Sequence, residues 1–401
     1  MEEVREFSLT ESGVQIDAQN RPHFFVGGDR VYHYWQDGGS WHSEVVDSHP
    51  RSGEHLRAAE GPSGDFHLIY DRIDLAPEST EHSRSFLITR QYATDRTGTW
   101  QIEEVPQPPG DEGNQYRVVT GLVVDASHVP HLMSFSNNGV TERQDLFLQS
   151  RPPGGWVIER INDDRQAHTA TRFSASSQLA IDGSGRLHAI WFTASGPEQL
   201  IYSFRDDQGW HHEPVTSVGD TTLLPAKDPS ALVVDAAGTA HVVFVNQSPA
   251  SDGYWHLVHL ERSPAGWRLD DLGLGGGNLV AALDAAGRAH VVFSSQLPND
   301  PNTNQERYVG VHARETDAGW VREDITPASP IDFWWNVNLS LRVDALGRLS
   351  VGNLLDTAQT RRLALFQRDS DWTSSAVAES GPVTFDDDYS FVPGASRVGS
   401  D

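Results

Sequence analysis

Short apolar stretches recur along the whole chain, separated by polar turns. In several stretches both alternating sets of positions are apolar; in Ala240–Val245 only His241 is polar. A strand with one solvent-exposed side would carry a polar residue at every second position, so this pattern predicts strands that are covered on both faces. No stretch shows the period of an amphipathic helix. The pattern therefore predicts an all-β protein made of packed sheets.

The apolar stretches belong to one repeating unit. Each copy has a strand ending at Asp, a tight turn that usually contains Gly, and a His six residues after the Asp that leads a second strand. A variable segment, a third strand and a Trp that opens a fourth strand follow. The Asp/His pairs are Asp17/His23, Asp125/His131, Asp182/His188, Asp235/His241 and Asp284/His290, with Asp344 followed by Ser350 in one copy and His67 preceded by Gly61 in another. The tryptophans are Trp41, Trp100, Trp156, Trp210, Trp267, Trp320 and Trp372.

Seven copies of a four-stranded unit predict a seven-bladed β-propeller, an architecture that protects strand edges by radial repetition. We expect a single domain over residues 1–401. The expected blades are about 13–46, 56–105, 118–161, 177–215, 230–272, 278–325 and 337–377, with flanking tails 1–12 and 378–401.

The repeat resembles the bacterial sialidase-like, or BNR-type, propeller repeats. Those repeats also have an Asp-containing turn, a His- or aromatic-led strand and a Trp that opens the outer strand. The resemblance covers about residues 13–377. The Asp-box of that family, Ser-x-Asp-x-Gly-x-Thr-Trp, is nowhere intact in this chain. The resemblance therefore implies the architecture and not sialidase activity.

Residues that recur in every blade are expected to be structural. They lie on a ring that is too wide for one metal ion, so we expect no metal site and no cofactor from them. We expect each repeated His to bond to the Asp or a turn carbonyl of its own blade, and each repeated Trp to pack between blades.

The parts of the chain that do not repeat are where function is expected. Connections between second and third strands, and between successive copies, are long, whereas the other turns are short. Antiparallel strands alternate in direction, so the long connections share one face of the disc. They include 71–84, 106–116, 162–176, 216–229, 246–254, 294–306 and 326–336. On that face we expect a partner-binding surface formed by Phe333, Trp334, Trp335, Tyr254, Trp255, Tyr116, Arg117, Arg172 and Phe173.

Charge and composition restrict the classes of binding partner that can be expected. The chain has 30 Lys and Arg against 56 Asp and Glu, a formal charge of −26, which disfavours nucleic acids and anionic membranes and favours a basic protein partner. Without cysteine, the chain has no disulfides and no thiolate catalysis. The start, Met1–Glu6, has neither the basic nor the apolar segment of a signal peptide, so a cytoplasmic protein is expected.

Two functions remain open. No common linear catalytic motif is present, so the first expectation is a protein that is not an enzyme and that binds a basic partner as a scaffold or sequestering regulator. The alternative is a propeller that binds or cleaves carbohydrate. Propeller-type polysaccharide lyases use His, Tyr and Arg at the channel without a linear motif. Here such a set could come from His55, Arg57, Tyr116, Arg117, His168 and Arg172.

Overall fold

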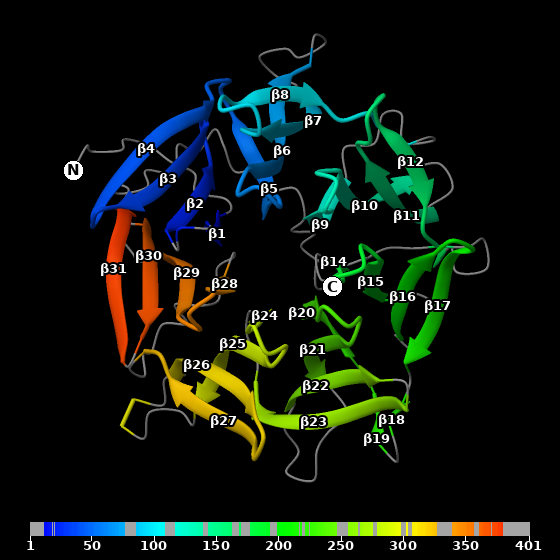
Figure 1. Ribbon diagram of the computed structural model, residues 1–401, viewed down its shortest axis with the longest axis vertical. Coiled ribbons are helices and arrows are strands. Elements are labelled where there is room, and N and C mark those ends of the chain that lie inside the picture. The colour runs from blue at the N-terminus through cyan, green and yellow to red at the C-terminus, as the bar shows by residue number, and fades with distance from the viewer. Residues whose placement is uncertain are drawn as a thin grey trace, which may run out of the picture.

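A computed structural model shows an all-β protein in which seven four-stranded antiparallel blades form a ring (Figure 1). This confirms the predicted seven-bladed β-propeller. Among the described residues, no helix could cross a membrane. The structure describes residues 12–17, 19, 21–76, 86–108, 117–138, 143–162, 168–169, 177–192, 199–215, 217–218, 221–223, 225–246, 256–263, 265–275, 279–297, 302–303, 307–326, 339–356, 361–369 and 371–379.

Each blade consists of four strands that are consecutive in the chain, called A to D from the channel outward. Blade 1 contains β1 (Ser12–Ile16), β2 (Pro22–Gly27), β3 (Val31–Asp37) and β4 (Ser40–Asp47). Blade 2 contains β5 (Ser52–Glu60), β6 (Phe66–Leu75), β7 (Phe86–Thr94) and β8 (Gln101–Glu104). Blade 3 contains β9 (Arg117–Val124), β10 (Pro130–Asn138), β11 (Arg143–Ser150) and β12 (Val157–Arg160), and blade 4 contains β14 (Gln178–Ile181), β15 (Leu187–Phe192), β16 (Leu200–Asp206) and β17 (Gly209–Val215).

The remaining blades follow the same order. Blade 5 contains β20 (Pro225–Val234), β21 (Ala240–Asn246), β22 (His256–Ser263) and β23 (Gly266–Leu274). Blade 6 contains β24 (Leu279–Leu283), β25 (Ala289–Leu297), β26 (Arg307–Thr316) and β27 (Gly319–Asp324), and blade 7 contains β28 (Ser340–Val343), β29 (Leu349–Asp356), β30 (Arg361–Arg368) and β31 (Trp372–Glu379). Outside this pattern, β13 (His168–Thr169) pairs with β11, and β18 (Ser217–Val218) pairs with β19 (Thr221–Thr222).

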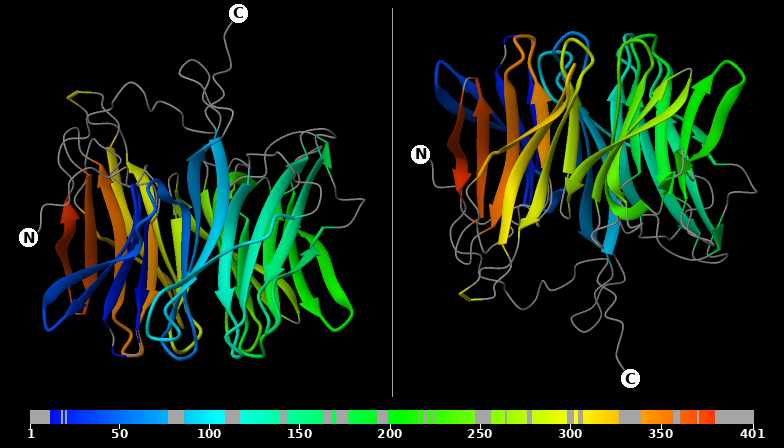
Figure 2. Two further views of the ribbon diagram at one scale, coloured as in Figure 1. Left: turned by 90° about the horizontal axis from the view of Figure 1, so that it is seen from above. Right: turned by 90° about the horizontal axis from the view of Figure 1, so that it is seen from below.

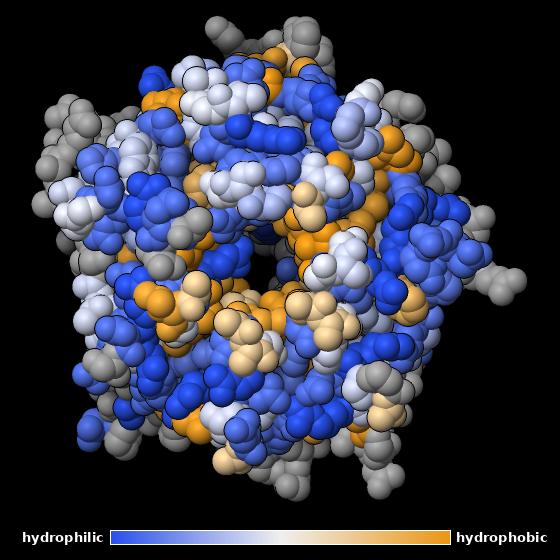
Figure 3. Space-filling model, viewed as in Figure 1, coloured by the Kyte–Doolittle hydropathy of each residue, from blue (hydrophilic) through white to orange (hydrophobic). Residues whose placement is uncertain are grey.

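The disc has two different faces (Figure 2). Antiparallel pairing places the A–B and C–D turns on one face, here called the turn face, and the ends of the other connections on the opposite loop face. The turn face is seen in Figure 3, where hydrophobic residues gather around the central opening. The A–B turns join the two innermost strands and carry exposed apolar residues, among them Leu346, which is 72% exposed.

The hydrophobic core is divided among the seven interfaces between blades. Each interface buries side chains of two adjacent blades, most of them from strands A to C, which agrees with the apolar residues on both faces of these strands. Every repeated tryptophan packs, half-buried, on the cluster between its own blade and the preceding one. Apolar burial at these interfaces therefore holds the blades together.

Polar contacts join blade 7 to blade 1 and close the ring. The Val14 backbone N–H donates to Ser340 Oγ (2.7 Å), and Arg342 Nε and Nη2 donate to Gln15 Oε1 (3.1 and 2.9 Å). The Gln15 amide nitrogen in turn donates to the Ala58 carbonyl of blade 2 (2.9 Å). Gln15 is 3% exposed, so its amide relies on these protein partners.

Replacing Arg342 with methionine is expected to weaken closure. Arg342→Met keeps an unbranched side chain but leaves the buried Gln15 oxygen without its donor, which should lower the free energy of unfolding by about 1–3 kcal/mol in urea titrations. The control is Arg348→Met, because Arg348 is 42% exposed and pairs with Asp344 inside its own turn. It should cost less than about 1 kcal/mol. Equal losses in both variants would contradict a closing role for Arg342.

Candidate functional site

The repeated Asp and His residues form a hydrogen-bonded network in the blades. In the A–B turns the Asp Oδ1 accepts backbone N–H groups two and four residues later, as at Asp182, where Ser184 (2.8 Å) and Arg186 (2.9 Å) donate. The His Nε2 atoms face the second carboxylate oxygen at 3.1 Å (His23–Asp17), 3.3 Å (His131–Asp125), 3.3 Å (His188–Asp182) and 3.7 Å (His290–Asp284). These contacts agree with the expected structural bond; its contribution to stability remains a prediction.

The network continues outward to strand C. Each His Nδ1 contacts a polar atom of that strand, at distances of 2.5–3.0 Å, namely His33 Nε2, Tyr92 OH, Ser150 Oγ, Tyr202 OH, His259 Nε2 and His312 Nε2. In blades 1, 5 and 6 the second His then contacts a strand D carboxylate, for example His33 Nδ1 and Glu44 Oε1 at 2.9 Å. Trp100 of the next blade donates its indole N–H to the same Glu44 oxygen (2.9 Å).

Blade 2 departs from the repeat at its turn. Gly61 occupies the place where the other copies have Asp, and the missing carboxylate comes from Asp65, whose Oδ2 lies 2.8 Å from His67 Nε2. The sequence pattern points only to Gly61 at this position, because Asp65 precedes His67 by two positions instead of six.

Strand A of blade 2 is also irregular. The register between β5 and β6 shifts between Ser52 and Glu54, and again between Glu54 and Arg57. Arg51 and His55 have φ values of 57° and 54°, in the left-handed region that a non-glycine residue seldom adopts. Bulges of this kind re-aim side chains and occur preferentially beside active sites. Among the described A strands, only that of blade 2 contains a non-glycine residue with positive φ, namely His55, and Arg51 directly precedes the strand.

Blade 1 holds the bulged segment in place through its backbone. The Gly28 N–H donates to the Ser52 carbonyl (3.0 Å), and the Arg51 N–H donates to the Asp29 carbonyl (2.9 Å). At this point the two blades approach so closely that a Cβ atom added at Gly53 would lie 2.3 Å from the Gly27 Cα. Only glycine fits such a contact, and Gly53 also has φ +105°.

The bulge brings His55 beside a buried ion pair. His55 Nδ1 lies 3.1 Å from Asp71 Oδ2, while Arg90 Nε and Nη2 donate to Asp71 Oδ1 (3.0 Å) and Oδ2 (3.3 Å). Asp71 and Arg90 are 1% and 4% exposed, whereas the His55 side chain is 32% exposed. Burial by itself raises the pKa of Asp71, but Arg90 and His55 together hold this pKa below its ordinary value. Asp71 is therefore ionised and can orient the His55 ring.

This cluster lies toward the loop face of blade 2, on the side that faces blade 3. His67, Ile69 and Asp71 alternate with Leu68 and Tyr70 along β6, and Ile69 belongs to the core cluster between blades 2 and 3. Asp71 therefore points to the same side as Ile69. The other side of β6 carries a second polar group, in which Tyr70 OH and Arg72 Nε both donate to Asp47 Oδ2 of blade 1 (2.8 Å each).

The predicted site residues are placed as follows. His55 and Arg57 lie on β5, and Arg117 begins β9, but its side chain is not described. His168 lies in β13, again without a described side chain. The rest of the predicted surface lies outside the described residues, namely Tyr116, Arg172, Phe173, Tyr254, Trp255, Phe333, Trp334 and Trp335.

The reading of the sequence missed Asp71 and Arg90. It assigned residues 71–84 to a loop because charged residues follow the apolar run at Tyr70, whereas β6 continues to Leu75. The available signal was the Asp71-Arg72 pair at the end of an otherwise apolar second strand, which the other copies lack.

Comparisons with known proteins describe the fold. No protein-family model matches the sequence, and no curated protein matches it. Solved structures of similar fold include a protein of unknown function from Dyadobacter fermentans (TM-score 0.50, 13% identity, 77% of this chain and 95% of that chain). An ulvan lyase of a new polysaccharide lyase family has TM-score 0.50 and 12% identity over 82% of this chain and 86% of that chain. A fucose-specific lectin from Aleuria aurantia has TM-score 0.48 and 9% identity over 93% and 97%.

These comparisons correct one prediction and limit another. The expectation that the chain is not an enzyme rested on missing linear motifs, and it is wrong as an inference because an ulvan lyase shares this fold. The BNR-type resemblance is supported at the level of the propeller, since no family model confirms that repeat family.

Proposed function

We propose that this protein binds and cleaves a polysaccharide at the loop face of blade 2, with His55 as the group that transfers a proton. The observation that carries the proposal is the bulged β5, which holds a half-exposed His55 against the buried Asp71–Arg90 pair. At this place, charged side chains that are not part of the repeat lie beside a strained backbone and a side chain that solvent can reach. The carbohydrate-active propellers of similar fold support this choice of substrate class.

The geometry favours a base at His55. The ionised Asp71 accepts a hydrogen bond from Nδ1–H, which leaves the lone pair on Nε2 and fixes the ring. Hydrolysis of a glycosidic bond generally uses two carboxyl groups that flank it. Asp71 is buried and bonded to Arg90, so it cannot act as one of them. The arrangement is better suited to β-elimination from a uronate.

In that reaction His55 Nε2 takes the proton next to the uronate carboxylate. The electron pair forms a carbon–carbon double bond, and the glycosidic oxygen leaves with a proton from solvent or from a donor group. A cation must neutralise the uronate carboxylate, and we assign this role to the half-buried Arg57 on the same strand. The chain as a whole is acidic, so anionic substrate binding depends on local arginines such as this one.

The test uses the full chain and a panel of polysaccharides. Uronate-containing and neutral polymers are incubated with the protein, and both the ultraviolet absorbance of an unsaturated uronate and the appearance of reducing ends are followed. His55→Ala should lower kcat/KM by at least about 100-fold because a proton-transfer group is lost. His49→Gln is the matched control, since His49 has a similar exposure (33%) but pairs with Asp74. No cleavage of any polymer, or an active His55→Ala variant, would overturn the proposal.

The docking of a basic protein on the loop face stays a prediction. Its aromatic residues lie outside the described part of the chain, and the comparisons give no support to a basic partner.

A further inference from the structure

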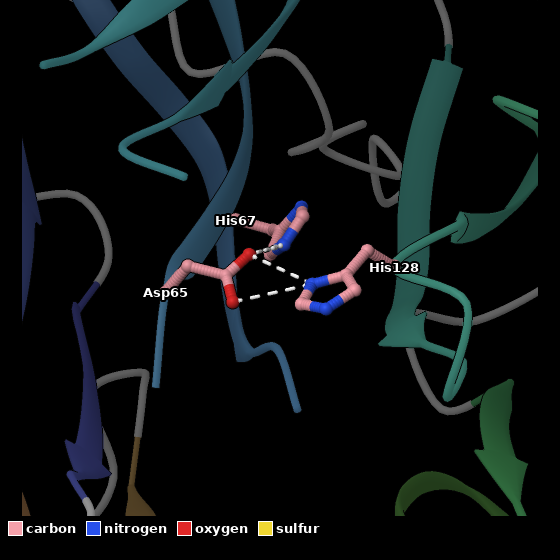
Figure 4. A group of neighbouring side chains, drawn as sticks. All are labelled: Asp65, His67 and His128. Carbon is pink, nitrogen blue, oxygen red and sulfur yellow. Dashed lines mark hydrogen bonds and ion pairs between the residues drawn. The ribbon is translucent and has the colours of Figure 1, made fainter. Parts of the chain in front are cut away.

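A second non-repeated group lies on the opposite, turn face. Asp65 and His67 of blade 2 meet His128 from the A–B turn of blade 3 (Figure 4). Asp65 Oδ2 is 2.8 Å from His67 Nε2, and Asp65 Oδ1 is 3.3 Å from His128 Nδ1. One ligand atom from each residue lies within 4.8 Å of the others, and no other such group occurs among the described residues.

We propose that Asp65, His67 and His128 bind one divalent transition-metal ion of the zinc class and thereby bridge blades 2 and 3. Zinc binds imidazole nitrogen and carboxylate oxygen at about 2.0–2.2 Å, so neighbouring ligand atoms of a tetrahedral site are about 3.3 Å apart. With Asp65 Oδ2 as the ligand atom, the 3.4 Å spacing to His128 Nδ1 already matches, and the 2.8 Å contact with His67 Nε2 would have to widen. The His128 side chain is 18% exposed, which leaves room for a fourth, solvent ligand.

The site combines two departures from the repeat. In blade 2 the carboxylate has moved from the Gly61 position to Asp65. In blade 3 His128 occupies the turn position that is glycine in blades 4 to 7, namely Gly185, Gly238, Gly287 and Gly347, all with positive φ. His128 adopts φ 61° there, a conformation that costs a non-glycine residue free energy. The turn conformation itself requires no side chain at this position, as the glycines of blades 4 to 7 show.

Other blade interfaces show what this turn position faces. A Cβ atom added at Gly238 would lie 3.2 Å from Asp182 Oδ2 of the preceding blade, and one added at Gly287 would lie 3.6 Å from Asp235 Oδ2. In blades 5 and 6 the position therefore adjoins the carboxylate of the preceding blade, whereas a Cβ atom added at Gly185 or Gly347 would meet nothing within 4 Å. His128 is the case in which that position supplies a metal-ligating side chain.

Each histidine contacts a hydroxyl group through the ring nitrogen that points away from Asp65, so the nitrogen that faces Asp65 is available to bind a metal. Tyr92 OH lies 2.5 Å from His67 Nδ1, and Ser63 Oγ lies 3.1 Å from His128 Nε2. If each of these ring nitrogens carries its proton and donates to the hydroxyl, His67 Nε2 and His128 Nδ1 present lone pairs toward Asp65. Second hydrogen bonds of this kind are the usual means by which metal-binding histidines are oriented.

The test is titration of chelator-treated full-length protein with zinc chloride, followed by calorimetry and by thermal unfolding. We expect one saturable site per chain and a higher Tm with zinc. His128→Gly restores the residue of the regular repeat, so the metal-free variant should fold and be at least as stable as the parent. It should bind zinc at least about 10-fold more weakly and lose the zinc-dependent rise in Tm.

Controls separate this site from adventitious binding. His211→Gln removes an exposed histidine that pairs with Asp206 and should leave the stoichiometry and the affinity unchanged. Calcium, which prefers oxygen ligands, should not displace zinc. Absence of saturable zinc binding, equal binding by His128→Gly, or displacement by calcium would overturn the proposal. If His128→Gly fails to fold, His128→Asn, which tolerates positive φ, serves for the same comparison.

Discussion

Acidification is expected to unfold this protein between pH 6.5 and pH 4. Burial, together with the charge of a neighbouring histidine, lowers the pKa of His23, His241 and His290 from 6.5 to about 4. The unfolded chain therefore takes up these protons at a higher pH than the native protein does. The stability that these groups contribute is complete above pH 6.5 and is lost as the pH falls toward 4. Each lost contribution is on the order of 3 kcal/mol, and three of them approach the total stability of a typical domain.

Other buried groups also change the free energy of unfolding between pH 6.5 and pH 4, and the direction of each change follows from the direction of its pKa shift. The pKa of five further repeat-network histidines is also lowered, chiefly by burial, which adds to the loss. Glu60 opposes it, because burial raises its pKa from 4.5 to about 7 and the native protein takes up that proton first. Asp17, whose pKa lies below 3.8, weakens the fold only at still lower pH.

Urea titrations at a series of pH values check this prediction. The free energy of unfolding should fall steeply below pH 6.5, and near pH 7 it should show only the smaller, opposite contribution of Glu60. Glu60→Gln, which removes the opposing carboxyl, should show an even steeper fall. A free energy of unfolding that stays constant down to pH 4 would contradict the buried, neutral histidines.

Gly53→Ala is expected to destabilise the protein strongly and to disrupt the His55 site. The added methyl group would lie 2.3 Å from the Gly27 Cα, and backbone on both sides prevents relaxation. The variant should lose more than about 3 kcal/mol of unfolding free energy, the range reached by overpacking combined with backbone strain. Because the same bulge positions His55, any folded fraction should also lose the activity proposed for that residue.

A second glycine provides the matched control. Gly209 has φ +109°, close to the +105° of Gly53, but a Cβ atom there would meet nothing within 4 Å. Gly209→Ala should therefore lower the free energy of unfolding only because alanine disfavours a positive φ, by about 1–2 kcal/mol. Equal losses in the two variants, measured by urea unfolding, would show that the contact between blades 1 and 2 is unimportant.

The sequence by itself determined the architecture. The Asp turn, the His and the Trp recur in register, and apolar residues fill both faces of the inner strands, so seven stacked blades were predictable. That information is local and repeated, because every blade solves the same packing problem against its neighbours. The same regularity explains why the His residues are bonded within their blades, as at His188 and Asp182.

Only the tertiary structure brought the candidate sites together. His55 lies next to Asp71 and Arg90 because two register shifts and a close contact with Gly27 re-aim one strand, and none of these has a sequence motif. Asp65 and His128 are 63 residues apart and meet only because adjacent blades place their A–B turns side by side. Departures from a repeat can be seen in the sequence, but which departures share a surface is decided by how the blades pack.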